Sequence, residues 1–157
     1  MIPQQAASVA PTPRVSVVMP LYNAASTLEA TIASVLAQSF EWFELIIVDD
    51  GSSDDSLKLA RALAATDQRL RVVSRSNGGV SSARNLGASL GTAPLIAFID
   101  ADDLWHRDKL SHHVAMHRGM PTCAASYARI AFIDEDAAAL DGAKTHSSLC
   151  PRKPQLH

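Results

Sequence analysis

A run of five apolar residues that ends abruptly in aspartates most constrains the fold of this chain. The run covers residues 95–99, and Asp100, Asp102 and Asp103 follow it. It is too short to span a membrane and lacks the alternation of a surface strand, so it predicts a strand buried on both faces of a parallel sheet. Parallel strands need helical crossovers, and the chain is therefore predicted to be an α/β protein.

The three aspartates predict a binding site at the end of that strand. Open α/β sheets bind ligands at the carboxyl ends of their strands. Carboxylates this close repel one another unless a cation lies among them, and Mg²⁺ or a similar ion takes one or two carboxylates with substrate phosphates and water. We therefore predict a metal and diphosphate site. The alternative is an acidic loop that caps a helix beginning near His106.

Strand-like and helix-like segments alternate along the rest of the chain. Apolar or β-branched runs predict further strands at 15–19, 43–48, 70–73 and 124–133. Helical spacing of apolar residues predicts helices at about 26–38, 53–64, 81–90 and 107–118. Ser26 and Glu29 have capping-box spacing, and Ser53 is a candidate cap for the second helix. This order favours βαβ units and a mostly parallel sheet flanked by helices.

Composition limits the classes of function. With 47% hydrophobic residues the chain can build a core, and a net charge of −2 offers no footprint for nucleic acid. No apolar run approaches the ~18 residues of a membrane-spanning helix. Two cysteines without metal or redox spacing indicate a reducing compartment, so we expect a cytoplasmic protein without a transmembrane segment. We expect a flexible tail at 1–13, one domain at 14–143 and an irregular tail at 144–157.

A second acidic pair, Asp49 and Asp50, follows the predicted strand at 43–48. Such a pair alone is most often turn chemistry, because aspartate bonds its own backbone two residues on. Recurrence after two strands favours a site instead. In that site Asp50 would accept hydrogen bonds from a nucleobase or a ribose hydroxyl, and Tyr22 would provide an aromatic wall.

The loop at 77–85 is a candidate phosphate cradle. Glycine lets backbone N–H groups approach an anion, and Arg84 can add a forked contact. The loop matches neither glycine-rich nucleotide motif, and a simple turn is the alternative for Gly78 and Gly79.

Other side chains near the acidic run have two interpretations each. Trp105 either shields the site or packs in the core, and His106 is a weaker candidate for a phosphate contact. His113 and His117 have a spacing that can hold zinc, but without a third ligand a solvated helix face is favoured.

Four ordered segments resemble the inverting glycosyltransferases of family 2, which have the GT-A fold. They are VSVVMPLYN at 15–23, ELIIVDDGSSD at 44–54, NGGVSSARN at 77–85 and DADDLW at 100–105. The resemblance implies a GT-A-type Rossmann-like α/β fold, of which this chain is the N-terminal donor-binding portion. The substrate-binding residues that it implies are Pro20, Tyr22, Asn23, Asp50, Arg84 and Asp100. It makes Asp102, in the D-x-D element, the ligand of Mn²⁺ or Mg²⁺.

The resemblance also implies an activity. A sugar would pass with inversion from a nucleotide diphosphate, with a UDP-sugar favoured, to a hydroxyl of a glycan or lipid-linked acceptor. The metal would act as a Lewis acid on the leaving diphosphate. This activity would belong to cell-surface polysaccharide or glycan synthesis. The protein would act in the cytoplasm or peripherally at the inner face of the membrane.

The catalytic base that the family places in a later acidic segment is not identified here. Asp134, Glu135 and Asp136 resemble the strand and turn after the acidic site rather than that base. We therefore expect a chain truncated at its C-terminus, with incomplete activity and with self-association or a partner chain covering its sheet.

Three alternatives to an active transferase differ in what they require. A nucleotidyltransferase needs a glycine-rich basic loop after the first strand, where residues 20–23 offer none. A phospho-receiver domain needs its acidic pair after the first strand, not after the second and fourth. A fragment that binds a nucleotide sugar without reacting it needs only the donor site.

Overall fold

The structure, a computed structural model, describes residues 12–128. They belong to two compact units, of which the first ends at Arg107 and the second begins at Asp108. This boundary falls inside the domain expected at 14–143, whose limits remain a prediction. Most of the two expected tails lies outside the described residues. Within the described part of the chain, no helix is long and apolar enough to cross a membrane.

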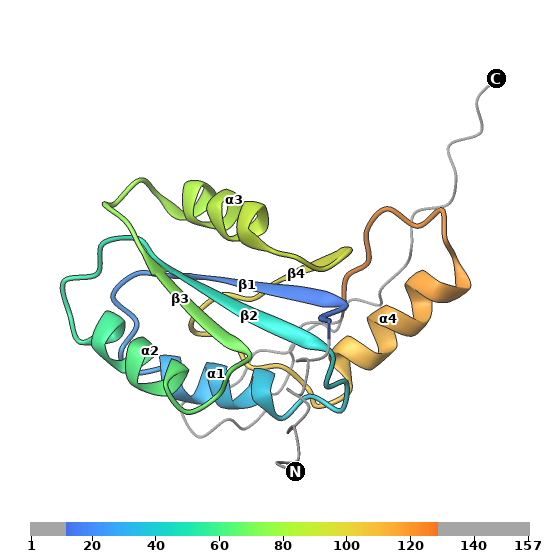
Figure 1. Cartoon of the computed structure of the whole chain (residues 1–157), viewed down its shortest axis with the longest axis horizontal. Coiled ribbons are helices and arrows are strands. Elements are labelled where there is room, and N and C mark those ends of the chain that lie inside the picture. The colour runs from blue at the N-terminus through green and yellow to red at the C-terminus, as the bar shows by residue number, and fades with distance from the viewer. Residues whose placement is uncertain (1–11, 129–157) are drawn as a thin grey trace, which may run out of the picture. The chain divides into compact units, whose positions relative to one another are not determined.

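The first unit contains a parallel sheet of four strands in the order β3-β2-β1-β4 (Figure 1). The strands are β1 (Val15–Leu21), β2 (Phe43–Asp49), β3 (Leu70–Ser74) and β4 (Leu95–Phe98). The helices that join them are α1 (Leu28–Leu36), α2 (Ser56–Ala64) and α3 (Val80–Leu90). The predicted α/β class with a parallel sheet is confirmed. The second unit contains α4 (Lys109–Gly119), close to the helix predicted at 107–118.

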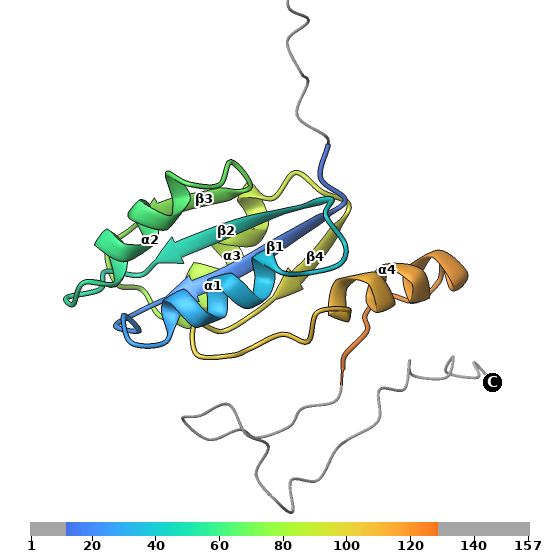
Figure 2. The same cartoon turned by 90° about the horizontal axis from the view of Figure 1, so that it is seen from below.

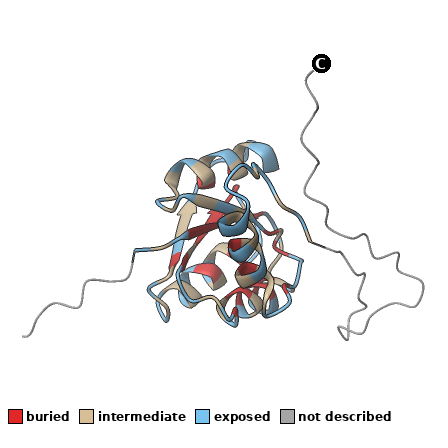
Figure 3. Cartoon of the chain, turned by 90° about the vertical axis from the view of Figure 1, so that its right-hand side faces the viewer, coloured by how far each residue is buried: buried red, intermediate tan, exposed pale blue. Residues whose placement is uncertain are grey.

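Helices cover both faces of the sheet, with α1 and α2 on one side and α3 on the other (Figures 1 and 2). All seven residues of the central strand β1 are buried, and Figure 3 shows buried residues along the strands. Ile46 and Val48 of β2 pack against Ala83 of α3, with Leu86 and Leu90 beside them. A β-branched strand between two helical layers is the expected pattern for a parallel sheet.

A glycine allows α3 to lie close to the sheet. A Cβ atom at Gly87 would overlap Val18 Cγ1 and would lie 3.2 Å from Val48 Cγ2. The helix that carries Arg84 therefore packs directly on β1 and β2, and this close packing fixes the distance between α3 and the sheet.

The strand predicted to be buried on both faces is instead an edge strand with an open face. Among the described strands, β4 pairs only with β1. Ile96 and Phe98 are 47% and 50% exposed. Their register partners in β1, Ser16 and Val18, are fully buried. The apolar run specifies a strand. How far that strand is buried depends on its position in the sheet, and sequence periodicity carries no information about that position.

The predicted caps and the fifth strand also differ from the structure. The N-cap of α1 is Thr27 and that of α2 is Asp55, and neither makes a side-chain cap hydrogen bond. The Thr27 hydroxyl bonds the carbonyl of Ala101 instead, and the Asp55 carboxylate lies 3.8 Å from Lys58 Nζ. Residues 124–128 form no strand, and the rest of the strand predicted at 124–133 lies outside the described residues.

Candidate functional site

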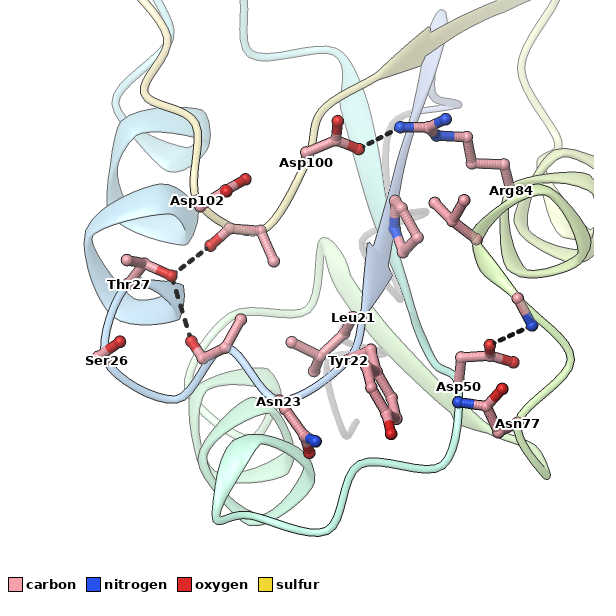
Figure 4. Close-up of a pocket in the computed structure, with 15 residues that line it drawn as sticks. Leu21, Tyr22, Asn23, Ser26, Thr27, Asp50, Asn77, Arg84, Asp100 and Asp102 are labelled. Atoms are coloured by element: carbon pink, nitrogen blue, oxygen red, sulfur yellow. Dashed lines mark hydrogen bonds and ion pairs between the residues drawn. The ribbon is translucent and has the colours of Figure 1, made fainter. Parts of the chain in front are cut away.

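A pocket of about 620 Å³ opens at the carboxyl ends of the strands, within the first unit (Figure 4). Its volume lies in the usual range for small-molecule sites. The structure brings all seven predicted site residues to this one pocket, which is lined by Pro20, Tyr22, Asn23, Asp50, Arg84, Asp100 and Asp102. The other lining residues are Leu21, Ala24, Ser26, Thr27, Asn77, Gly79, Val80 and Ala101. Carboxylates from the ends of β2 and β4 therefore share one cavity.

Asn23 locks the loop after β1 to the loop after β2. Its backbone has a left-handed φ of 49°, which asparagine tolerates better than most residues. The Asn23 side-chain oxygen accepts hydrogen bonds from the N–H of Ser53 at 2.8 Å and the N–H of Asp54 at 3.4 Å. Asn23 therefore holds the rim of the pocket in place, and beside it Tyr22 is 54% exposed.

The carboxylate of Asp54 strengthens the same junction. It accepts hydrogen bonds from the N–H of Ser56 at 3.0 Å and the N–H of Ala25 at 3.2 Å. Hydrogen bonds from Ser56, first from its side chain and then from its backbone, hold the pKa of Asp54 below its ordinary value. The junction is therefore formed with Asp54 ionised.

Asp50 is buried and organises the loop that leads into α3. Its carboxylate accepts hydrogen bonds from the N–H of Gly78 at 3.0 Å and the N–H of Gly79 at 2.7 Å. The guanidinium of Arg75 lies 3.2 Å from the same carboxylate. The glycine N–H groups, considered as a phosphate cradle, thus face a carboxylate of the chain itself. Gly79 has a φ of 87°, a conformation that suits glycine.

Asn77 belongs to the loop predicted as a phosphate cradle, and in the structure it lines the pocket next to Asp50 (Figure 4). An asparagine before two glycines is an ordinary turn residue, so its residue type alone does not mark it as a site residue. Its exposed side-chain amide offers both a hydrogen-bond donor and an acceptor to whatever enters the pocket.

The backbone between Asp100 and Asp102 is held from α1 and its N-cap. The carbonyl of Ala101 accepts hydrogen bonds of 2.9 Å from the hydroxyls of both Thr27 and Thr31. No sequence pattern marks this pair, because Thr27 at a helix start is typical of a cap and Thr31 lies inside the helix. The contacts fix the loop that presents the two aspartates.

Arg84 points from α3 to Asp100. Its Nη2 lies 2.5 Å from Asp100 Oδ1, and the side chains are 35% and 48% exposed respectively. The Nε atom of Arg84 is buried, and it has no hydrogen-bond partner among the described residues. A buried donor without a partner is costly and is a reason to expect a ligand or water there.

The donor set fits a hard divalent ion completed by a substrate. No three His, Cys, Asp or Glu side chains within residues 12–128 converge in a way that could hold a metal by themselves. Asp102 is exposed at the pocket, and Asp100 lies two residues before it. One or two carboxylates with phosphate oxygens and water are the usual set for Mg²⁺ and similar ions.

Several other predicted candidates do not line the pocket. Asp49 is buried and accepts hydrogen bonds from the N–H of Ser52 and the hydroxyl of Ser74. Asp103 and His106 do not line it either, and Trp105 is buried in the core.

In the second unit, His113 and His117 are half-buried, so they are less exposed than the solvated helix face that was expected. Both lie within hydrogen-bonding distance of the Ser126 hydroxyl, at 2.7 Å and 3.0 Å. Burial, followed by the nearby charge of Lys109, lowers the pKa of His113. Both histidines therefore have a hydrogen-bonding partner, Ser126, within the second unit.

Comparison with known sequences identifies a family. The family model described as "Glycosyl transferase family 2" matches residues 16–146. TuaG of Bacillus subtilis, named a putative teichuronic acid biosynthesis glycosyltransferase, is 37% identical over 132 residues, which are 82% of this chain and 51% of TuaG. WfgD of Escherichia coli, named a UDP-Glc:alpha-D-GlcNAc-diphosphoundecaprenol beta-1,3-glucosyltransferase, is 37% identical over 65% of this chain and 40% of WfgD. The chain thus spans about half or less of these relatives.

Solved structures share the fold. The mannosyltransferase PcManGT from Pyrobaculum calidifontis, in complex with GDP-Man and Mn²⁺, has a TM-score of 0.68 at 26% identity and covers 82% of this chain and 40% of PcManGT. Residues 1–349 of TarS from S. aureus, in complex with UDP-GlcNAc, have a TM-score of 0.63 at 26% identity and cover 68% of this chain and 31% of that structure.

Proposed function

Because this chain belongs to glycosyl transferase family 2, we propose that its pocket is the donor site for a nucleotide diphosphate sugar. A UDP-sugar is the favoured donor, and the sugar passes to an acceptor hydroxyl with inversion. The observation that carries the proposal is that seven residues from four separate segments line one pocket of about 620 Å³. UDP-GlcNAc and GDP-Man in structures of similar fold support a nucleotide sugar as the ligand class.

The base and the ribose occupy the side of the pocket formed by Pro20, Tyr22 and Asp50 in this proposal. The exposed ring of Tyr22 offers a face for stacking. Asp50 is already bonded by two glycine N–H groups and an arginine, so a ligand donor shares the carboxylate with them. The amide of Asn77 provides further polar groups at the same end.

The diphosphate lies between Arg84 and the two aspartates that follow β4. Asp102 is the metal ligand, and Mn²⁺ or Mg²⁺ fits a site with so few protein carboxylates. When bound, such an ion neutralises the charge that develops on the leaving diphosphate. Thr27 and Thr31 keep Asp102 at the edge of the pocket by fixing the carbonyl of Ala101.

The acceptor in this proposal is a glycan or a lipid-linked saccharide. The names of TuaG and WfgD, which refer to teichuronic acid and to a diphosphoundecaprenol-linked acceptor, support that class. An acceptor on a lipid carrier would bring the protein peripherally to the membrane surface.

Calorimetric titration with UDP and GDP, with and without Mn²⁺, tests the donor site. Wild-type protein should bind UDP in a Mn²⁺-dependent way, and Asp102→Asn should lose that dependence. Asp55→Asn is the matched control, because Asp55 is exposed at the N-cap of α2 and does not line the pocket. Binding that is indifferent to Mn²⁺, or equally affected in both variants, would refute the metal site.

A donor-binding portion that does not catalyse transfer by itself is the second candidate. Among the described residues, the acidic side chains that line the pocket are Asp50, Asp100 and Asp102. Asp50 is bonded within the chain, Asp100 is paired with Arg84, and Asp102 is assigned to the metal, so none is left to act as the base. Release of UDP from UDP-GlcNAc in the presence of saccharide acceptors distinguishes the two candidates, because only a complete enzyme turns over.

A further inference from the structure

The ion pair between Arg84 and Asp100 stands where the proposed ligands would bind. Both residues line the pocket, and Asp100 Oδ1 already faces a guanidinium at 2.5 Å. A divalent ion approaching Asp100 would meet the positive charge of Arg84, and like charges repel each other even where solvent partly screens them. The unliganded pocket therefore opposes metal binding at Asp100.

The pair is also one that a ligand can exchange. Its two side chains are about one third and one half exposed, and partly exposed ion pairs contribute little to stability. Arg84 has in addition a buried Nε–H without a partner among the described residues. A phosphate can accept from Nε–H and Nη2–H together in a forked contact, which a single carboxylate oxygen does not provide here.

We propose that Arg84 is an exchangeable counter-ion for Asp100. In the empty pocket its guanidinium neutralises Asp100, and on donor binding it turns to the diphosphate and leaves Asp100 available to the divalent ion. Arg84 thereby makes binding of the nucleotide and of the metal cooperative. The inference rests on the proposed donor site and adds a regulatory role within it.

Thermodynamic linkage gives the proposal a distinctive sign. If the nucleotide removes Arg84 from Asp100, then each ligand raises the affinity for the other by the same factor. Removing the guanidinium should therefore tighten Mn²⁺ binding when nucleotide is absent and weaken UDP binding when Mn²⁺ is present. A residue that only supports the fold would weaken both.

The experiment compares wild-type protein with Arg84→Gln. Mn²⁺ affinity is measured without nucleotide from the EPR signal of the free ion, and UDP affinity is measured by calorimetry at saturating Mn²⁺. We expect Mn²⁺ to bind at least about threefold more tightly to Arg84→Gln, as expected for loss of a partly exposed ion pair. UDP should bind on the order of tenfold more weakly, as expected for loss of a charge-assisted hydrogen bond.

Two further variants control for charge and folding. Arg61→Gln removes the same charge from an exposed position on α2 that does not line the pocket, and it should change neither affinity. Arg84→Lys keeps the charge without the fork, so its Mn²⁺ affinity should stay near that of wild type while UDP binding weakens. If thermal unfolding shows that Arg84→Gln does not fold, Arg84→Met, which also removes the positive charge, replaces it with the same expected tightening of Mn²⁺ binding.

The outcomes separate this inference from the proposed function. Unchanged or weaker Mn²⁺ binding to a folded Arg84→Gln overturns the counter-ion role even if UDP binds, and so does the absence of Mn²⁺ binding to both proteins. Failure of wild-type protein to bind UDP at any Mn²⁺ concentration overturns the donor site itself.

Discussion

The hydroxyl of Thr31, on α1, donates a 2.9 Å hydrogen bond to the carbonyl of Ala101, which lies between Asp100 and Asp102. Farther along the same helix, Ser34 accepts from the N–H of Trp105 at 3.1 Å. Gln38, just beyond the helix, donates to the carbonyl of His106 at 2.8 Å. Polar side chains of α1 and of the turn after it thus fasten the loop that follows β4 and carries Asp100 and Asp102.

Removing the Thr31 hydroxyl should therefore loosen this loop. Thr31→Val keeps the shape but leaves the Ala101 carbonyl with only the Thr27 hydroxyl, and it should cost about 1 kcal/mol of unfolding free energy. Urea unfolding measures the loss. Thr66→Val is the control, because its exposed hydroxyl bonds only the nearby carbonyl of Leu63, and its effect should stay within about 0.5 kcal/mol. Equal effects in both variants would contradict the fastening role.

Two carboxylates of the same pocket should respond differently to the same change. Asp50→Asn weakens the contacts with two glycine N–H groups and the Arg75 guanidinium, and it should lower the unfolding free energy by roughly 1–3 kcal/mol. Asp102→Asn alters an exposed side chain, so it should change the unfolding free energy by no more than about 0.5 kcal/mol. Chemical denaturation of both variants checks the contrast, and a destabilised Asp102→Asn would show a structural role for Asp102.

Alanine at Gly87 should destabilise the packing of α3 on the sheet. The helix gains about 1 kcal/mol in propensity from the change, whereas overpacking against Val18 costs roughly 1–3 kcal/mol. We expect Gly87→Ala to lower thermal stability. In the double variant with Val18→Ala, the loss should be smaller than the sum of the losses in the two single variants. Gly119→Ala, with open space around its Cβ, should be neutral or stabilising. A stabilised Gly87→Ala would mean that α3 shifts without cost.

Acid should weaken the junction at the amino ends of β1, β2 and β4. Burial alone would raise the pKa of Glu44, but hydrogen bonds from Thr92 and Ser16 outweigh it and leave the pKa below its usual 4.5. A lowered pKa contributes stability that is present above the unfolded value and lost as pH falls through the folded value. The stability difference between wild type and Glu44→Gln should therefore shrink below pH 4.5, as measured by urea unfolding. Carboxyl groups titrate between roughly pH 6 and 3. If the difference in unfolding free energy between wild type and Glu44→Gln stayed constant across that range, this prediction would be contradicted.

The helices and strands of the first unit could be predicted because their signals are local. The β-branched run of β1 and the apolar spacing of α1 each specify an element without reference to the rest of the chain. The parallel topology then places the ends of all strands at one edge, which is why Asp50, Asp100 and Asp102 could be expected near one another. Their roles in binding stay predictions.

The partners of those side chains could not be predicted in the same way. The sequence left open whether Gly78 and Gly79 face a phosphate or form a simple turn, and in the structure their N–H groups bond Asp50. Thr27 lines the pocket without any motif to mark it, and nothing in the segment at 77–85 indicates that Asn77 lies next to Asp50. Hydrogen bonds between residues far apart in the sequence depend on loop paths, and periodicity contains no information about those paths.

The sequence by itself determined the order of elements, their parallel arrangement and the gathering of acidic residues at one sheet edge, because hydrophobic periodicity and crossover geometry leave few alternatives. Only the tertiary structure decided that β4 lies at the edge among the described strands, with Ile96 and Phe98 exposed, and that Arg84 is paired with Asp100. Burial and charge pairing arise from which surfaces meet in space, and that meeting is a property of the packed chain as a whole.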